Sequence, residues 1–272
     1  MRSLTDPTAM NHSIVSRLAF GLVATGALVA CGGTDDYRVV SSTGSISAPF
    51  VPNAQARYVF FGRNDGASGP LNSPGTYNQD VGGAVTALGL TEISGDIAVN
   101  DMRGDATFAM GRWSRGHVNG VNLDTDLTGT DGRSYHYLVY NGLTAFPAAS
   151  TRTCDAGVFT APSQASGVTV ADGSTLGTTT GAATLVFSSA GARVGVTFTT
   201  TANGESNNAS FATTIVDLAQ YGNATGDYLA QRAGANFVLG NAGNGAVMVG
   251  VTYRIGLSNN AIFEGVMKFR CA

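Results

Sequence analysis

The histidines are the first candidates for catalysis in this 272-residue chain. Two of them, His117 and His136, lie outside the N-terminal segment. His136 stands between Tyr135 and Tyr137 in a strand-like run, which favours a structural hydrogen-bonding role over that of a catalytic base. His117 follows a glycine and is expected in a turn. No Gly-x-Ser-x-Gly nucleophile elbow accompanies either histidine, so we expect no enzyme and no catalytic residues.

An acidic stretch suggests calcium only superficially. Its side-chain oxygens belong to Asn122, Asp124, Asp126 and Asp131. An EF-hand loop that began at Asn122 would need Gly at its sixth position and Glu at its twelfth, where this chain has Leu127 and Arg133. We therefore expect a solvated turn, with a looser calcium site as the alternative. No cofactor and no other metal are expected.

Three arginines could form a basic patch that meets an acidic partner, namely Arg112, Arg115 and Arg133. Trp113, next to the first of them, is expected in the core. The Gly-rich run 240–245 resembles a nucleotide loop only superficially, because it joins two expected strands and no helix N-terminus follows it to hold phosphate. A net charge of −3, with 12% charged residues, also argues against a nucleic-acid partner.

The N-terminal segment indicates where the chain is sent. Residues 18–28 form an apolar run that is too short for a membrane span of roughly 20 residues but fits a signal peptide, with Met10 as a possible true start. The run ends in Leu28-Val29-Ala30-Cys31, which resembles the bacterial lipobox. A lipobox implies removal of residues 1–30, lipid on Cys31 and anchoring in the outer membrane of a Gram-negative cell. An ordinary signal peptide with a coincidental cysteine is the alternative.

The other two cysteines are Cys154 and Cys271. Two thiols usually pair in an oxidising compartment, so we expect a disulfide between them. Neither has a nearby His or a second Cys at ligand spacing, which leaves a metal site or a reactive thiol as the weaker alternative.

Composition and patterning predict an all-β protein. The chain has 37 Gly but only 7 Pro, and amphipathic helical runs are hard to find. We expect a signal peptide over 1–30, a flexible tether over 31–56, a short β-rich segment over 57–104 and a barrel domain over 105–272. The strands of that barrel are expected at 105–113, 134–140, 182–188, 193–201, 209–216, 235–239, 245–255 and 260–270. Eight strands can close into an antiparallel barrel whose side chains fill its interior.

Alternation places an apolar face inside this barrel. Glu264, Lys268 and Arg270 share one face of the last expected strand, opposite Phe263 and Phe269. That pattern fits a solvated exterior, so we expect a soluble eight-stranded barrel and not one that spans a membrane. By the same alternation Cys271 lies on the apolar face, and a disulfide would attach the last strand to the long 141–181 loop region.

Three segments carry a resemblance to a known family. They read Gly-Arg-Trp-Ser-Arg-Gly at 111–116, Tyr-His-Tyr-Leu-Val with Asn-Gly-Leu-Thr-Ala-Phe-Pro at 135–147, and a C-terminal hairpin at 249–269. Their order and spacing resemble the β-barrel domain of transferrin-binding protein B-like surface lipoproteins, a superfamily that includes the factor H-binding protein barrel. The resemblance implies a surface or periplasmic eight-stranded barrel and names no ligand.

These features together predict a lipid-anchored outer-membrane lipoprotein that binds a macromolecular ligand, such as a host or environmental protein. It would contact the membrane only through its lipid. Two alternatives are a structural envelope lipoprotein and a carrier of small ligands in the barrel lumen. The carrier needs an open lumen and would be excluded by one that is filled by Phe187, Phe198, Phe263 and Phe269.

Overall fold

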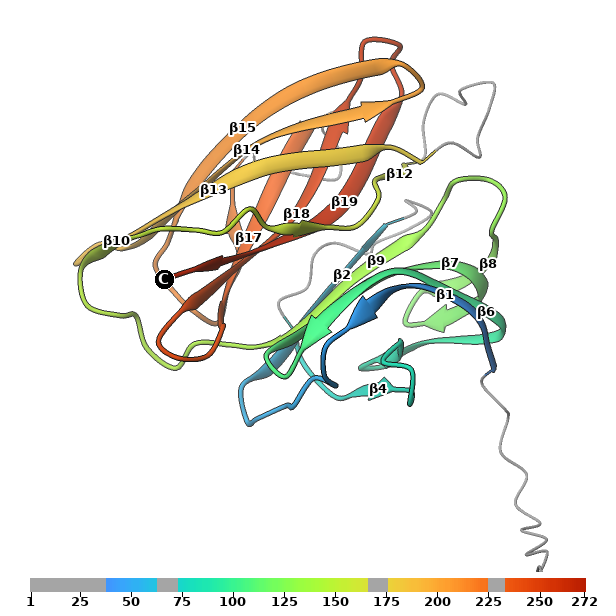
Figure 1. Ribbon diagram of the computed structural model, residues 1–272, viewed down its shortest axis with the longest axis horizontal. Helices are drawn as coiled ribbons and strands as arrows, with labels where there is room; N and C mark the ends of the chain where they lie inside the picture. The colour runs from blue at the N-terminus through green and yellow to red at the C-terminus, as the bar shows by residue number, and fades with distance from the viewer. Residues whose placement is uncertain (1–37, 63–72, 166–175, 225–232) are drawn as a thin grey trace, which may run out of the picture. The chain divides into compact units, whose positions relative to one another are not determined.

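The computed structural model describes residues 38–62, 73–165, 176–224 and 233–272, and the regular elements in these ranges are all β-strands. They belong to one compact unit, Asp36–Ala272, and form three sheets (Figure 1). Within the described ranges, no helix has the length and apolar character needed to cross a membrane. The expected signal peptide and Cys31 lie outside the described residues.

The first sheet has nine strands in the order β3-β2-β9-β7-β6-β5-β4, with β1 paired to β6 and β8 paired to β7. The bounds are β1 Arg38–Ile46, β2 Ala56–Gly62, β3 Ser73–Pro74, β4 Tyr77–Gln79, β5 Val85–Leu88, β6 Thr91–Asp105, β7 Phe108–Gly120, β8 Leu123–Thr128 and β9 Tyr135–Asn141. The β1–β6 pair is parallel, whereas β7 is antiparallel to β6, β8 and β9.

This nine-stranded sheet curls around a core of its own. Buried side chains from six of its strands form one cluster, in which the Trp113 ring lies 5.1 Å from Phe60 and 6.1 Å from Tyr137. One sheet can bring residues of so many of its strands together only by bending, so the sheet is a half-barrel. Trp113 is fully buried, as expected, and its Nε1–H donates to the Val85 carbonyl at 2.7 Å.

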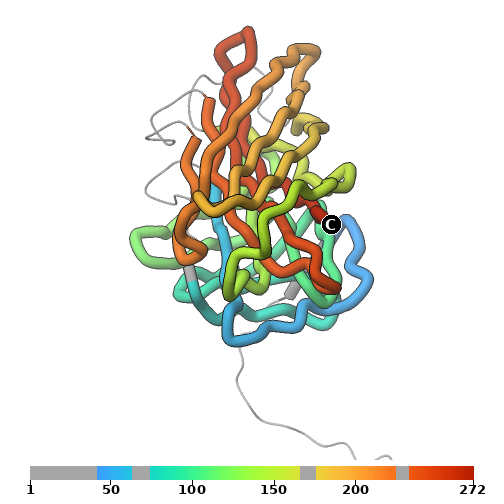
Figure 2. The backbone as a smooth tube through the Cα atoms, turned by 90° about the vertical axis from the view of Figure 1, so that its left-hand side faces the viewer, coloured from blue at the N-terminus to red at the C-terminus, as the bar shows by residue number. Residues whose placement is uncertain are grey.

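The second and third sheets are built from the later part of the chain. The four-stranded sheet has the order β10-β13-β14-β15, and the six-stranded sheet has the order β11-β19-β18-β17-β16 with β12 also paired to β19. The bounds are β10 Ser150–Arg152, β11 Val158–Phe159, β12 Ser163–Gln164, β13 Thr178–Ser188, β14 Gly191–Ala202, β15 Glu205–Ile215, β16 Gly222–Asn223, β17 Ala233–Asn241, β18 Val247–Gly256 and β19 Ile262–Cys271. The long hairpins β14–β15 and β18–β19 can be followed in Figure 2.

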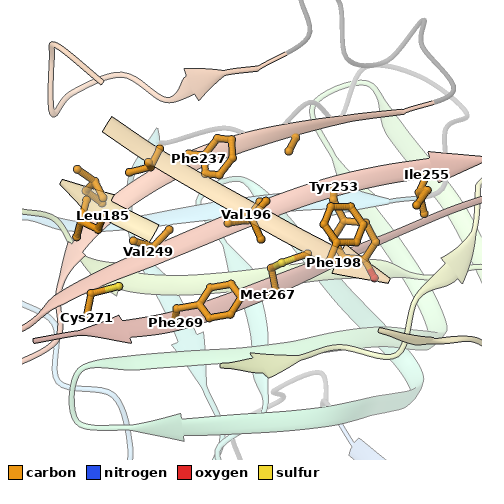
Figure 3. Packing of buried hydrophobic residues seen from close by; sticks show 14 of the residues in the cluster. Leu185, Val196, Phe198, Phe237, Val249, Tyr253, Ile255, Met267, Phe269 and Cys271 are labelled. Atoms are coloured by element: carbon orange, nitrogen blue, oxygen red, sulfur yellow. The ribbon is translucent and has the colours of Figure 1, made fainter. Parts of the chain in front are cut away.

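The inner faces of these two sheets share one apolar core (Figure 3). Phe198 of β14 packs on Tyr253 of β18, with ring centroids 4.7 Å apart. The four phenylalanines that would exclude a lumen carrier are all buried in this core, namely Phe187, Phe198, Phe263 and Phe269. These four rings occupy the core in which an open lumen would have to lie.

The expected disulfide is confirmed. Cys154 and Cys271 are joined by an S–S bond of 1.99 Å. Cys271 belongs to the same core as Phe263 and Phe269, as the alternation predicts. The bond links the end of β19 to the segment that follows β10, and Thr153 and Ala272 exchange two backbone hydrogen bonds beside it.

The outer face of the six-stranded sheet packs against the nine-stranded sheet. A third cluster joins Val238, Met248 and Val266 of the former to Leu138 and Tyr140 of the latter. The expectation of a solvated exterior on the last strand is therefore wrong for Glu264 and Lys268, which are 0% and 6% exposed. Alternation identified the correct face, but β2 and β9 cover that face.

The eight strands predicted from alternation all form, although not in one sheet. The segments predicted at 105–113 and 134–140 contribute to β7 and β9, which pair with each other and with β6 and β2. The nine-stranded sheet therefore runs across the expected boundary at residue 105. Residues 38–46, expected within a flexible tether, form β1 instead; Thr43 Oγ1 accepts from the Asp101 N–H at 3.1 Å and fastens this strand to β6.

Candidate functional site

Arg112 on β7 is a buried cation with a fixed position. Its residue is 3% exposed, its Nε donates to Asp101 Oδ2 at 2.8 Å, and its Nη1 donates to Ser134 Oγ at 2.7 Å. A buried charge that loses its partner costs about 3–5 kcal/mol, so these two bonds are what allow a guanidinium to stay here. The third nitrogen, Nη2, makes no hydrogen bond with the described residues and can therefore serve a ligand.

Asp101 reaches Arg112 because β6 carries a bulge. The pairing of β6 with β7 shifts register between Asn100 and Arg103, and Asp101 takes a φ of 57°, a left-handed conformation that is uncommon outside glycine. Asp101 Oδ2 also accepts the Ala161 N–H at 3.0 Å. Strained backbone of this kind persists where neighbouring contacts hold it, and it is concentrated at functional sites.

Arg133 lies beside Arg112 at a small cavity of about 80 Å³. The cavity is lined by Asn100, Arg112, Ser114, Gly129, Gly132, Arg133 and Leu176. Arg133 is carried by the β8–β9 loop, where Gly129 and Gly132 have φ values of 78° and 66°. Asp131 Oδ1 accepts the Arg133 N–H at 3.1 Å and holds this turn in place.

The lining of the cavity is positive. It contains two guanidinium groups and no carboxylate, because Asp101 holds Arg112 from outside the lining. The polar remainder is preorganised: Asn100 Nδ2 donates to Ser114 Oγ at 2.6 Å, and Thr43 Oγ1 donates to Asn100 Oδ1 at 3.2 Å. Such a site can attract and hold an anionic group.

Of the three arginines predicted to form a basic patch, the structure brings two to this cavity. Arg115 lies outside the lining, where its Nε is 3.2 Å from Asp96 Oδ2 and both side chains are partly or largely exposed. An exposed pair of this kind contributes little to stability. Arg115 is therefore a neighbour of the site and not one of its ligating groups.

His136 on β9 is the cross-strand partner of Arg112 on β7 and lies in a buried polar cluster. Its Nδ1 is 2.8 Å from Thr160 Oγ1 and its Nε2 is 2.8 Å from Ser163 Oγ. A serine and a histidine in contact are the geometry of a nucleophile and its base, but here both residues have no exposed surface and no carboxylate lies on the other ring nitrogen. Burial, followed by the charge of Arg112, holds the pKa of His136 well below its usual value, so the ring is neutral. The structural role expected for His136 fits this geometry.

A second buried charged pair belongs to the same interface between sheets. Arg254 Nη2 lies 3.0 Å from Glu264 Oε2, and the side chains are 4% and 0% exposed. Burial raises the pKa of Glu264 to about 7 although Arg254 acts in the opposite direction. Glu264 Oε1 has no hydrogen-bond partner among the described residues, and both side chains of the pair are almost fully buried.

Of the acidic stretch, Asp124 and Asp126 lie in β8, whereas Asn122 and Asp131 lie just outside its two ends. His117 Nδ1 is 2.9 Å from Asp126 Oδ1, and its Nε2 is 3.5 Å from Asp124 Oδ1. The prediction that His117 lies in a turn is wrong, because β7 runs from Phe108 to Gly120 and includes it. In the described part of the chain, no group of three or more His, Cys, Asp or Glu side chains could hold a metal ion.

Comparison of the chain with protein-family models, with curated proteins and with solved structures found no match. The case for a site therefore depends on the geometry alone. Sequence reasoning selected Arg112 and Arg133 but missed Asp101, Asn100 and Ser114, which fix the cavity. The Asn-Asp pair at 100–101 was a detectable signal, because both residue types tolerate the left-handed conformation that a bulge can require.

Proposed function

We propose that this chain is a lipid-anchored envelope protein whose folded part binds a macromolecular ligand outside the membrane. The observation that carries the proposal is the bond between Cys154 and Cys271. A disulfide is typical of a chain that has been exported to an oxidising compartment. The pairing also leaves Cys31 as the one cysteine not engaged in it, and Cys31 ends the lipobox-like sequence.

The fold supports a surface protein of the kind that the resemblance implies. We propose that eight strands, β10 with β13–β15 and β16–β19, act together as the barrel of this protein. Three observations support that assignment: the two sheets share one core, the disulfide joins the β10 side to β19, and Asn207 Nδ2 of β15 donates to the Gly256 carbonyl of β18 at 2.8 Å. The nine-stranded half-barrel would then be an additional body that covers the outer face of the six-stranded sheet.

We favour binding over catalysis because the Arg112–Arg133 cavity lacks a nucleophile–base pair. The cavity offers guanidinium, amide and hydroxyl groups from Arg112, Arg133, Asn100 and Ser114. The contact between Ser163 Oγ and His136 Nε2 is fully buried and lies outside this cavity. A cation-lined cavity next to the β8–β9 loop suits recognition of an acidic group on a partner.

The experiment is performed on intact cells that produce the full chain and, in parallel, a Cys31→Ser variant. We expect wild-type protein in the outer-membrane fraction, with the mass of its N-terminal peptide increased by lipid, and release of the Cys31→Ser variant in soluble form. We also expect external protease to cleave the wild-type protein, which would place it at the surface. A mature N-terminus without lipid, or retention of the chain in the cytoplasm, would disprove the proposal.

Capture of ligands then separates the binding role from a purely structural one. Folded full chain should enrich a specific macromolecule from the medium or host extract in which the cells grow. Loss of envelope integrity after deletion of the protein, with no enriched partner, would instead support a structural envelope lipoprotein.

A further inference from the structure

The geometry points to an oxyanion-binding site in the Arg112–Arg133 cavity, which would receive a carboxylate, sulfate or phosphate group of a larger ligand. This inference rests on the proposed function, because it names the chemical group by which the macromolecular ligand would be held. The cavity combines two cations from separate elements, β7 and the β8–β9 loop.

Arg112 supplies a preset hydrogen-bond donor. Because Asp101 and Ser134 already occupy Nε and Nη1, the guanidinium plane is fixed before any ligand arrives. A fixed donor loses little conformational entropy on binding, and an arginine–oxyanion contact is stronger than one between neutral groups. With a residue exposure of 3%, Arg112 is also poorly screened by solvent.

Arg133 supplies the adjustable half of the site. It is only partly buried, and its own backbone N–H is held by Asp131. No acidic side chain among the described residues forms an ion pair with the Arg133 guanidinium, so its positive charge is available to an anion. An anion that bridges Arg112 and Arg133 would neutralise this charge.

The size of the cavity limits the group that it can take. At about 80 Å³ it is far below the roughly 300–1,000 Å³ of pockets that enclose drug-sized ligands. It would therefore hold one small oxyanion while the rest of the ligand stays outside. The hydroxyl of Ser114 and the amide of Asn100 add neutral polar groups at the same cavity.

Neighbouring charges do not already satisfy the site. Asp96 is engaged by Arg115 outside the lining, and neutral His136, the cross-strand neighbour of Arg112, adds no positive charge. Asp101 balances one of the two guanidinium charges. Asp131 lies in the same loop as Arg133, where its Oδ1 accepts the Arg133 N–H, and it does not line the cavity. The described lining therefore presents two guanidinium groups to a single anionic group of the ligand.

The test is an NMR titration of the full chain at constant ionic strength. The probes are sodium acetate and sodium sulfate, with acetamide and dimethyl sulfone as neutral molecules of similar shape. We expect saturable shifts of the Arg112 and Arg133 Nε–H signals and of the Gly129 and Gly132 amides with the anions only. Tighter binding of acetate would indicate a carboxylate ligand, and tighter binding of sulfate would indicate a sulfate or phosphate ester.

Variants make the result specific. Arg133→Gln should weaken anion binding at least tenfold, whereas Arg115→Gln, a matched change of a partly exposed arginine outside the lining, should leave it unchanged. Shifts that do not saturate, that also occur with the neutral probes, or that persist in Arg133→Gln would overturn the inference.

The inference and the proposed function can fail separately. A macromolecule that is captured equally well by wild-type protein and by Arg133→Gln would overturn the oxyanion site and leave the proposed function intact. Lack of lipid on Cys31 together with saturable anion binding would overturn the proposed function and leave the oxyanion site intact.

Discussion

The outer faces of β14 and β18 have opposite environments although their inner faces share one core. On β14, outward residues such as Arg193, Thr197 and Thr201 are exposed. On β18, Met248, Thr252 and Arg254 are buried at 1–3% exposure. Alternation is equally clear in both strands, so the difference comes from the nine-stranded sheet, which covers β18 and leaves β14 uncovered. Alternation determines which side chains share a face, and contacts from elsewhere in the chain decide whether that face is solvated.

The largest effect should come from the bond that ties the two sheets together. Replacing Cys154 and Cys271 by serine should lower the free energy of unfolding by about 4–5 kcal/mol, because the bond closes a long loop with a sequence separation of 117. Chemical denaturation of the double variant, with reduced wild-type protein as a control, measures the change. A loss below about 1 kcal/mol would mean that the sheets are held by their core alone.

A charge placed on each outer face tests the comparison directly. Thr252→Glu should destabilise the protein by about 3–5 kcal/mol, because the carboxylate would enter a buried face without a partner. Thr197→Glu should change stability by no more than about 0.5 kcal/mol, because this threonine is exposed. Urea unfolding of both variants provides the measurement. Equal effects would show that the face of β18 is open to solvent after all.

The buried carboxylate predicts a pH dependence that the exposed face lacks. Because the pKa of Glu264 is about 7 in the folded chain and ordinarily 4.5, the folded state binds the proton more tightly than the unfolded state does. The contribution of Glu264 is fully present below pH 4.5 and is lost as pH rises towards 7, by about 3 kcal/mol. His136 acts oppositely: its lowered pKa makes stability fall as pH drops below 6.5.

The variant Glu264→Gln separates these two effects. We expect the stability of Glu264→Gln relative to wild type to rise between pH 4.5 and 7. Below pH 6.5 the variant should still lose stability as wild type does, because His136 is unchanged. Unfolding free energies measured at half-unit pH steps give both curves. A difference between variant and wild type that does not change with pH would mean that the pKa of Glu264 is not raised.

The pairing of Glu264 with Arg254 shows how far sequence reasoning reaches. The alternation in 260–270 correctly predicts a strand and puts Phe263 and Glu264 on opposite faces of it. Charged residues on one face normally indicate solvent, and nothing local to β19 reveals that β2 and β9 cover it. The contact is made by residues more than a hundred positions away in the chain, so periodicity has no access to it.

The candidate site divides in the same way. Arg112 and Arg133 were predictable as a basic patch from their residue type, but their meeting at one cavity depends on the bulge at Asp101 and on the turn between Gly129 and Gly132. The role of Arg115 was mistaken for the same reason. Its partner Asp96 lies across the β6–β7 pair, and the register shift between Ser94 and Ala98 could not be deduced from the sequence.

The smallest expected effect has opposite signs on the two faces. Thr252 Oγ1 is buried and has no hydrogen-bond partner among the described residues, so Thr252→Val should stabilise the chain by about 1 kcal/mol by removing an unsatisfied polar group without changing its size. Thr197 Oγ1 is exposed and lies 3.2 Å from Ser210 Oγ, so Thr197→Val should destabilise it slightly, by about 0.5 kcal/mol or less. Thermal unfolding of the two variants should therefore move the melting temperature in opposite directions. A loss of stability in Thr252→Val would show that a water or another group satisfies this hydroxyl, and that the covered face of β18 is more polar than its neighbours indicate.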